Sequence, residues 1–312
     1  YLGWHAVFAS AAIGLAIAFI TFFVGKKRYQ LHDPRNITHN KSKLFKAFIA
    51  IIFLIITAFC GIHNKTMSDI FFTLIGLLSL AFLIYNIKAH TGDERKKLTA
   101  FTILTVFSGL YWAVYFQQFF SVSLAAERVT NLSMPASSLT AFESLGVIIF
   151  GPLINGLWLW LQHRNKDLSI PAKFSLSFLF NGLSFFILIV SLQYAINHNS
   201  QLLQIFIIIS YLMIAFGELL IAPIGLAMVS TLTPQRLNGA MMGIFLMSIG
   251  LGGKLAGILA QSAASTENST INQLEHIYRN SFMIYCSFSL LIFIICLIMI
   301  KPINKLIQGT TT

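Results

Sequence analysis

The chain has 312 residues, of which 56% are hydrophobic and only 10% are charged, and its formal net charge is +11. About a quarter of the residues in soluble domains are charged, so this composition excludes an ordinary soluble protein. The basic excess does not indicate nucleic-acid binding either, because the Lys and Arg residues lie in short segments between long apolar blocks. Blocks of roughly 20 apolar residues match the ~30 Å hydrocarbon core of a bilayer. The sequence therefore predicts an integral membrane protein.

Nine apolar blocks follow one another along the chain. Membrane-spanning strands would alternate apolar and polar residues over about ten positions, whereas these blocks are long and continuous, so helices are expected. The predicted fold class is an all-α membrane protein, a polytopic helical bundle. The polar stretch 263–280, which contains a glycosylation sequon at Asn268, is expected to form an outer loop. The predicted spans are residues 3–25, 44–62, 68–87, 98–124, 139–161, 173–195, 202–230, 238–262 and 281–300.

The segments that connect these blocks differ sharply in charge. Seventeen of the 21 Lys and Arg residues lie on one side of the predicted bundle, and the segments of the other side contain only Lys65, Arg128 and Arg279. The positive-inside rule places the basic side in the cytoplasm. Nine crossings then put Tyr1 outside and Thr312 inside, in a multi-pass protein of the cell (inner) membrane. With an external start and no visible signal peptide, earlier spans are expected upstream.

One carboxylate, Glu218, lies in the middle of the apolar run 215–225. A charge at the bilayer centre costs about 2.5–3.5 kcal/mol on insertion scales, so such a residue usually faces a polar cavity or pairs with another charge. The alternative is a protonated Glu218 that serves only helix packing. Pro223, five residues on, frees a backbone carbonyl and permits a bend or gate beside the acid.

Further polar groups lie within or beside other spans. Lys254 is the only basic residue inside a span, and it either pairs with Glu218 on the preceding helix or extends its stem to the outer interface. Trp112 lies too deep in its span for an interfacial aromatic belt. Glu143 begins the fifth span, where it either lines a mouth or faces lipid headgroups.

No enzyme signature is present in this sequence. It contains no G-x-S-x-G, H-E-x-x-H or Walker A motif, and its ten acidic residues are scattered. The three cysteines lie in apolar runs without C-x-x-C spacing, which indicates packing rather than a disulfide or a metal site. We therefore expect neither an enzyme nor ATP-driven transport by this chain.

Five stretches stand out in their order along the chain: GWHAVFASAAIG (3–14), YWAVYFQQ (111–118), FESLGVIIFGPLINGLW (142–158), IPAKFSLSFLFNGLSF (170–185) and GELLIAPIGLAMVSTLTPQRLNGAMMG (217–243). Together they resemble the sixth to eleventh helices of the proton-dependent oligopeptide transporters of the major facilitator superfamily. The last of them is the most specific, and it covers the tenth helix, a cytoplasmic turn and the start of the eleventh. The resemblance extends over nearly the whole chain.

This resemblance implies a domain organisation. Residues 1–30 would be the sixth helix, residues 31–93 a linker with two extra transmembrane helices such as bacterial members insert, and residues 94–312 the C-terminal six-helix bundle. The first five helices of the family, with its E-x-x-E-R proton-coupling motif, have no counterpart in this chain. The fold is thus expected to be the C-terminal half of a major facilitator fold.

The resemblance also implies roles for residues. Glu218 would face the central cavity and help hold the amino terminus of a peptide. Trp112 would be a cavity wall or gate aromatic, and Tyr115 and Gln117 would belong to the pocket. Phe245, at a possible gate, stands where the family more commonly has Trp.

The expected function is that of the C-terminal part of a proton-coupled di/tripeptide symporter working by alternating access. Its partners would be peptides, protons, the lipid bilayer and the missing N-terminal bundle, with no cofactor beyond the proton gradient and no nucleic acid. Phe116 and Gly146 replace a polar or acidic residue and an Asn of the family, which leaves the substrate open. The alternatives are a related transporter for another small amphipathic solute, and a non-transporting membrane fragment or subunit.

Overall fold

The computed structural model describes residues 3–28, scattered positions between 45 and 61, and residues 64–264 and 269–308. The chain divides into two compact units, Tyr1–Ser68 and Asp69–Thr312. Tyr1, Asn268, Thr312 and much of the predicted span 44–62 lie outside the described residues.

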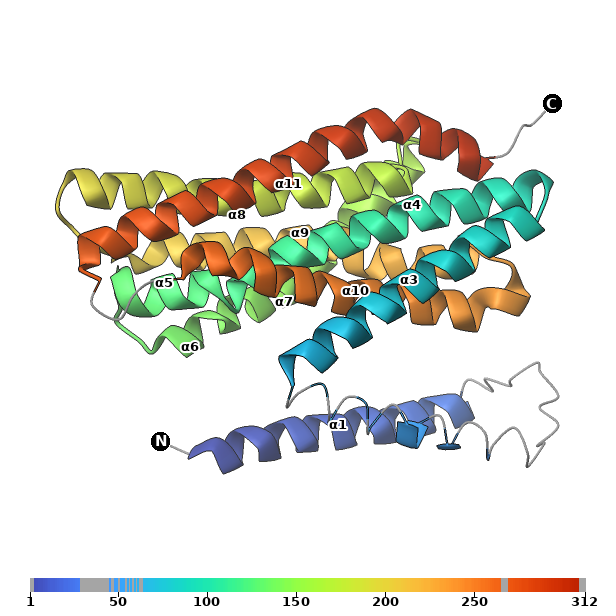
Figure 1. The fold of residues 1–312 in the computed structure, drawn as a ribbon, viewed down its shortest axis with the longest axis horizontal. Coiled ribbons are helices and arrows are strands. Elements are labelled where there is room, and N and C mark those ends of the chain that lie inside the picture. The colour runs from blue at the N-terminus through green and yellow to red at the C-terminus, as the bar shows by residue number, and fades with distance from the viewer. Residues whose placement is uncertain are drawn as a thin grey trace. The chain divides into compact units, whose positions relative to one another are not determined.

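The described part of the chain is almost entirely helical (Figure 1). Short 3-10 turns at Phe116–Gln118, Gln235–Leu237 and Gln261–Ala263 follow or join helices, and the two-residue strands β1 (Thr130–Asn131) and β2 (Leu202–Leu203) pair in parallel. The helices are α1 (Gly3–Arg28), α3 (Lys65–Ala89), α4 (Gly92–Tyr115), α5 (Ser121–Val129), α6 (Ala136–Leu139), α7 (Ala141–His163), α8 (Ile170–Asn197), α9 (Gln204–Leu232), α10 (Asn238–Ala260) and α11 (Ile271–Gln308).

Eight helical segments among the described residues are long and apolar enough to cross a membrane. They coincide with eight of the nine predicted spans, which confirms the predicted polytopic helical fold. The fourth predicted span, 98–124, corresponds to the 38-residue segment Gly92–Val129. This segment contains α4, a 3-10 turn and α5, so the α-helix is interrupted just beyond Tyr115.

The last helix begins earlier than the sequence analysis predicts. α11 starts at Ile271, so the expected outer loop 263–280 is helical over its second half. Gln273 Oε1 accepts the backbone N–H of Thr270 at 2.9 Å, and Thr270 Oγ1 accepts that of Gln273 at 3.4 Å. This reciprocal arrangement is a capping box, which satisfies backbone donors that a helix start leaves free. The T-x-x-Q pattern is readable in the sequence, and it outweighs the polarity of the segment.

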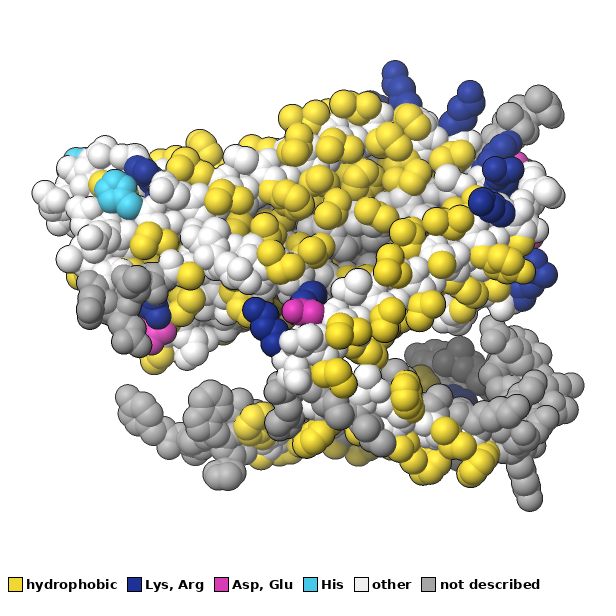
Figure 2. All heavy atoms as spheres, viewed as in Figure 1, with side chains coloured by type: hydrophobic (Ala, Val, Ile, Leu, Met, Phe, Trp, Pro, Cys, Tyr) yellow, Lys and Arg dark blue, Asp and Glu magenta, His cyan; other side chains and the backbone are white. Residues whose placement is uncertain are grey.

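The body of the second unit is built from α4 and α7–α11. α8 packs along α9 and α11, α4 packs along α10, and α7 packs on α9 (Figure 1). Its interior is apolar, with fully buried residues such as Leu104, Phe178 and Ile221. Hydrophobic side chains also cover the middle of the surface drawn in Figure 2, and Lys and Arg side chains gather at the end where α3 meets α4. This distribution suits a bundle surrounded by lipid.

The C-terminal end of α3 is tied to the turn between α9 and α10. His90 Nδ1 lies 2.6 Å from the carbonyl oxygen of Asn86, and Nε2 lies 2.6 Å from Nη2 of Arg236. A carbonyl oxygen can only accept, so Nδ1 carries the ring hydrogen, and Nε2 accepts from the guanidinium group. The buried side chain of His90 therefore joins the end of α3 to the turn between α9 and α10.

Candidate functional site

Glu218 and Glu143 meet at the hydroxyl group of Tyr115. Tyr115 Oη lies 3.1 Å from Glu143 Oε1 and 3.1 Å from Glu218 Oε2. The three side chains come from α4, α7 and α9, and they are 6% exposed for Tyr115, 9% for Glu143 and half-buried for Glu218. Within the described part of the chain, neither carboxyl group forms an ion pair. The phenol thus contacts both acids, which also interact with each other directly.

Two glycines allow the helices that carry these acids to approach one another. A Cβ atom on Gly146 would lie 2.8 Å from that of Ala215, so α7 is closer to α9 than a larger residue permits. Gly146 lies about one helical turn after Glu143. A Cβ atom on Gly217 would lie 3.1 Å from Tyr111 Oη, so the backbone beside Glu218 packs directly on α4. The close packing of small residues thus brings both carboxyl groups to the same phenol.

Aromatic rings from α4 and the following turn surround this phenol. The ring of Trp112 is 7% exposed and contacts Tyr115 edge-on, with centroids 4.7 Å apart. It also packs against Tyr111 and Phe116, each at 5.7 Å. The indole N–H has no hydrogen-bond partner among the described groups. Trp112 therefore contributes a rigid apolar surface beside the acids, with one donor unused; its role as a cavity wall stays a prediction.

Gln117 differs from the expected pocket amide. It is fully buried; its Nε2 donates to the carbonyl oxygen of Ala256 at 2.9 Å, and its Oε1 accepts from the Ser121 hydroxyl at 3.0 Å. Both ends of the amide are thus occupied, because the 3-10 turn directs this side chain toward α10. Gln118 is also fully buried, and neither polar atom of its amide has a partner among the described residues. The free amide is one residue further along than the sequence suggests.

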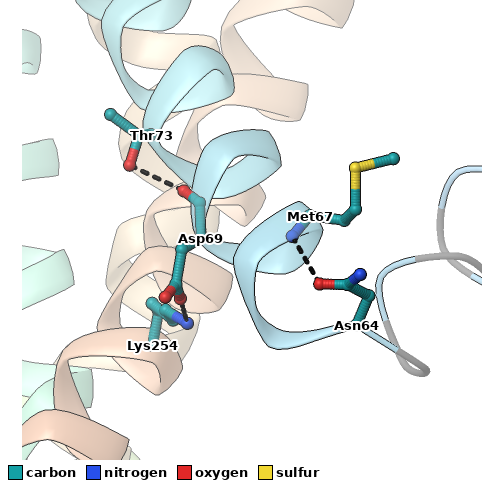
Figure 3. Close-up of polar contacts among 5 residues, drawn as sticks. All are labelled: Asn64, Met67, Asp69, Thr73 and Lys254. Atoms are coloured by element: carbon teal, nitrogen blue, oxygen red, sulfur yellow. Dashed lines mark hydrogen bonds and ion pairs between the residues drawn. The ribbon is translucent and has the colours of Figure 1, made fainter.

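Lys254 contacts Asp69 and not Glu218. Figure 3 shows the Lys254 ammonium group of α10 facing the carboxylate of Asp69 in the first turns of α3. The backbone carbonyl of Asp69 accepts the Thr73 hydroxyl at 2.7 Å, and Asn64 Oδ1 accepts the N–H of Met67 at 3.2 Å (Figure 3). Of the two alternatives for Lys254, pairing with Glu218 is therefore wrong. The reason is that Asp69, the only acid of the predicted span 68–87, neutralises the lysine nearer the membrane edge.

The two residues predicted at a gate or hinge lie close together. Pro223 is inside α9, which continues past it to Leu232, and the proline ring is exposed. The buried ring of Phe245 from α10 fills the space over Gly225, two residues beyond the proline. A bend at Pro223 would therefore move the surface on which Phe245 packs. The movement itself stays a prediction.

Comparisons with known proteins agree on one family. The model of the POT family (PTR2) matches residues 1–277. Dipeptide and tripeptide permease B of Aliivibrio fischeri (strain MJ11) is 24% identical over 275 residues, which are 86% of this chain and 56% of that protein. Permease B of Salmonella typhimurium (strain LT2) is 23% identical over 318 residues, which are 99% of this chain and 65% of that protein.

Solved structures support the fold independently. A tetrameric crystal structure of PepTSo2 has a TM-score of 0.73 and 22% identity, with 97% of this chain and 64% of that chain covered. The chain thus spans roughly three-fifths of the relatives that it matches. These matches confirm the resemblance derived from the five sequence stretches. This chain belongs to the POT family.

Proposed function

We propose that this chain is the C-terminal part of a proton-coupled di/tripeptide symporter that works by alternating access around a site near the bilayer midplane. One observation carries the proposal: the mid-span carboxyl group of Glu218 meets Tyr115 in a chain of a family whose curated relatives are named dipeptide and tripeptide permeases. An N-terminal bundle, which the relatives' additional length would supply, completes the cavity. The chain acts as a transporter and not as an enzyme.

Glu218 would receive the amino terminus of the substrate. Its side chain is half-buried, so water is reduced around it while a ligand can still reach it. Charge attraction is much less screened there than in bulk water. The Tyr115 hydroxyl contacts Glu218, and the ring of Trp112 packs against Tyr115, so the surroundings on this side are aromatic. An acid flanked by aromatic rings therefore suits a primary amine better than an anionic group.

The proposed orientation places the basic end of the bundle in the cytoplasm, with Thr312 inside the cell and Tyr1 outside. Lys88 lies in the last turn of α3, Arg95 is the fourth residue of α4, and Lys305 lies in the last turn of α11. Figure 2 shows Lys and Arg gathered at this end of the second unit. The positive-inside rule then favours a cytoplasmic position for that end, in the cell (inner) membrane.

A related transporter for another small amphipathic solute is the second candidate. One similar structure, with a TM-score of 0.69 and 22% identity, is that of a POT family transporter in complex with 5-aminolevulinic acid. Another, with 24% identity, holds alafosfalin. Phe116 and Gly146 also remove polar groups that the family resemblance leads us to expect around a peptide. A substrate with an amine but no peptide bond would still meet Glu218.

Uptake into proteoliposomes tests the proposal and separates the two candidates. The chain is fused behind the first five helices of a dipeptide and tripeptide permease, and uptake of labelled dialanine, trialanine and 5-aminolevulinic acid is measured with and without an inward proton gradient. We expect gradient-dependent peptide uptake by the fusion protein and none by the 312-residue chain alone. Uptake of only the non-peptide amine would favour the second candidate, and a folded fusion protein without any uptake would contradict both.

A further inference from the structure

We propose that Glu143 and Glu218 together hold one proton, so that the pair is a proton-binding site within this bundle. The site consists of the two carboxyl groups and the Tyr115 hydroxyl between them. It requires no substrate and no second bundle, and so does not rest on the proposed transport function.

The number of hydrogen atoms available between the three groups supports the proposal. Tyr115 Oη makes two contacts of 3.1 Å with carboxyl oxygens, but a phenol has a single hydrogen to donate. If both carboxyl groups were ionised, one contact would bring two oxygen atoms together without a hydrogen between them. If one carboxyl group is protonated, it donates to Tyr115 Oη while the phenol donates to the other acid. One proton taken from water therefore turns both contacts into hydrogen bonds.

Among the described residues, no positively charged side chain forms an ion pair with Glu143 or Glu218 that could stabilise two negative charges. Three tyrosines are the titratable groups that face the pair, namely Tyr111 and Tyr115 from α4 and Tyr211 from α9. Ion pairs of the described residues join Lys254 to Asp69, Lys96 to Asp93, Lys173 to Asp167 and, when the histidine is protonated, His90 to Glu94. Two ionised carboxylates that share a buried site repel each other, so a single proton removes the least favourable charge state.

Two buried polar side chains without partners among the described residues lie near the pair. The Tyr111 hydroxyl is fully buried beside Gly217, the residue before Glu218, and has no hydrogen-bond partner among the described residues. The Gln118 amide is also fully buried and unpartnered, and it lies in the surroundings of the Tyr115 hydroxyl. Leaving such groups unpaired costs free energy. Neither group bonds to a carboxyl oxygen, but both are polar and lie close to a pair that keeps one negative charge after binding one proton.

Infrared spectroscopy of the full 312-residue chain in lipid nanodiscs tests the proposal. A protonated carboxyl group has a carbonyl stretching band that a carboxylate lacks, and the band shifts in heavy water. We expect the wild type at neutral pH to show a band equivalent to one carboxylic acid in this pair, which disappears at alkaline pH. Glu143→Gln and Glu218→Gln should each remove it completely, because the remaining acid no longer has a charged neighbour. Absence of the band from the wild type would overturn the proposal without any variant.

Controls distinguish the pair from a single protonated acid and from a metal-ion site. Glu275 is another buried carboxyl group, only 3% exposed, and Glu275→Gln should leave the band unchanged. A band that survives in Glu143→Gln or in Glu218→Gln assigns the proton to one residue and contradicts sharing. Tyr115→Phe keeps the aromatic ring but should shift the band, since the hydrogen bond from the carboxylic acid to the Tyr115 hydroxyl is lost. An unshifted band would contradict the role of Tyr115 between the two acids. Replacing sodium by choline should change nothing, whereas a band that appears only without sodium would show a cation site instead.

Discussion

Replacing Lys254 by methionine should destabilise the second unit through Asp69. Methionine keeps an unbranched side chain in α10 but removes the ammonium group, so the Asp69 carboxylate of α3 loses its partner. The structure gives no other cation to that carboxylate among the described residues. The linker helix would then carry an unpaired charge within an apolar span, and α3 should detach more readily from α10.

The expected cost follows from the depth and exposure of the pair. Asp69 is the fifth residue of α3 and lies roughly 6 Å from its start at about 1.5 Å per residue. The side chains of Lys254 and Asp69 are 30% and 45% exposed, which is intermediate between a surface pair and a buried one. Surface pairs contribute about 0.2–1 kcal/mol, and a charge at the membrane centre costs about 2.5–3.5 kcal/mol. Lys254→Met should therefore cost about 1–2 kcal/mol, or roughly 2–8 °C in melting temperature.

A double-mutant cycle measured by thermal unfolding in detergent checks this assignment. Asp69→Asn alone should also destabilise, because it leaves the lysine unpaired, and the double variant should recover most of the loss. We expect a coupling energy of about 1 kcal/mol or more, as is typical of groups in direct contact. Additive effects of the two substitutions would refute the pairing. A destabilised Lys254→Met that Glu218→Gln rescues would instead support a pair between Lys254 and Glu218.

Two further predictions concern packing and orientation. Gly146→Ala should destabilise the protein by about 1–3 kcal/mol, because its methyl group would meet Ala215. Gly156→Ala in the same helix should be neutral or stabilising, since nothing lies within 4 Å of a Cβ atom there. Equal thermal shifts for the two variants would contradict the close contact between α7 and α9. In a variant without native cysteines, Ser200→Cys should react with an impermeant reagent from outside and Asn165→Cys only after permeabilisation. The opposite labelling pattern would reverse the proposed topology.

The membrane spans were readable from the sequence because a bilayer imposes a length and an apolar composition on each of them. The start of α11 precedes the predicted span 281–300 because the capping box of Thr270 and Gln273, and not hydropathy, fixes where this helix begins. Helix ends depend on such local hydrogen bonds, which a reading of hydropathy does not include.

The candidate site was only partly predictable. Glu218 stands out in sequence because an acid in an apolar block is costly, but its neighbours depend on how the helices rotate and pack. Glu143 could equally have faced headgroups, and only the close approach at Gly146 places it against Tyr115. The 3-10 turn after α4 likewise directs the Gln117 amide to the carbonyl oxygen of Ala256 in α10, and it leaves the Gln118 amide without a partner among the described residues. Such details arise from contacts between distant segments.

The central claim is that Glu218 receives the substrate amine, and the most direct test compares a free dipeptide with its N-acetylated form. Inhibition of labelled-peptide uptake by each compound is measured for the fusion protein and for its Glu218→Gln variant. The wild type should favour the free amine, and the variant should lose about 1.5–3 kcal/mol of affinity for it, roughly 10- to 150-fold, with little change for the acetylated form. A well-folded Glu218→Gln variant that still discriminates between the two compounds as the wild type does would contradict the account.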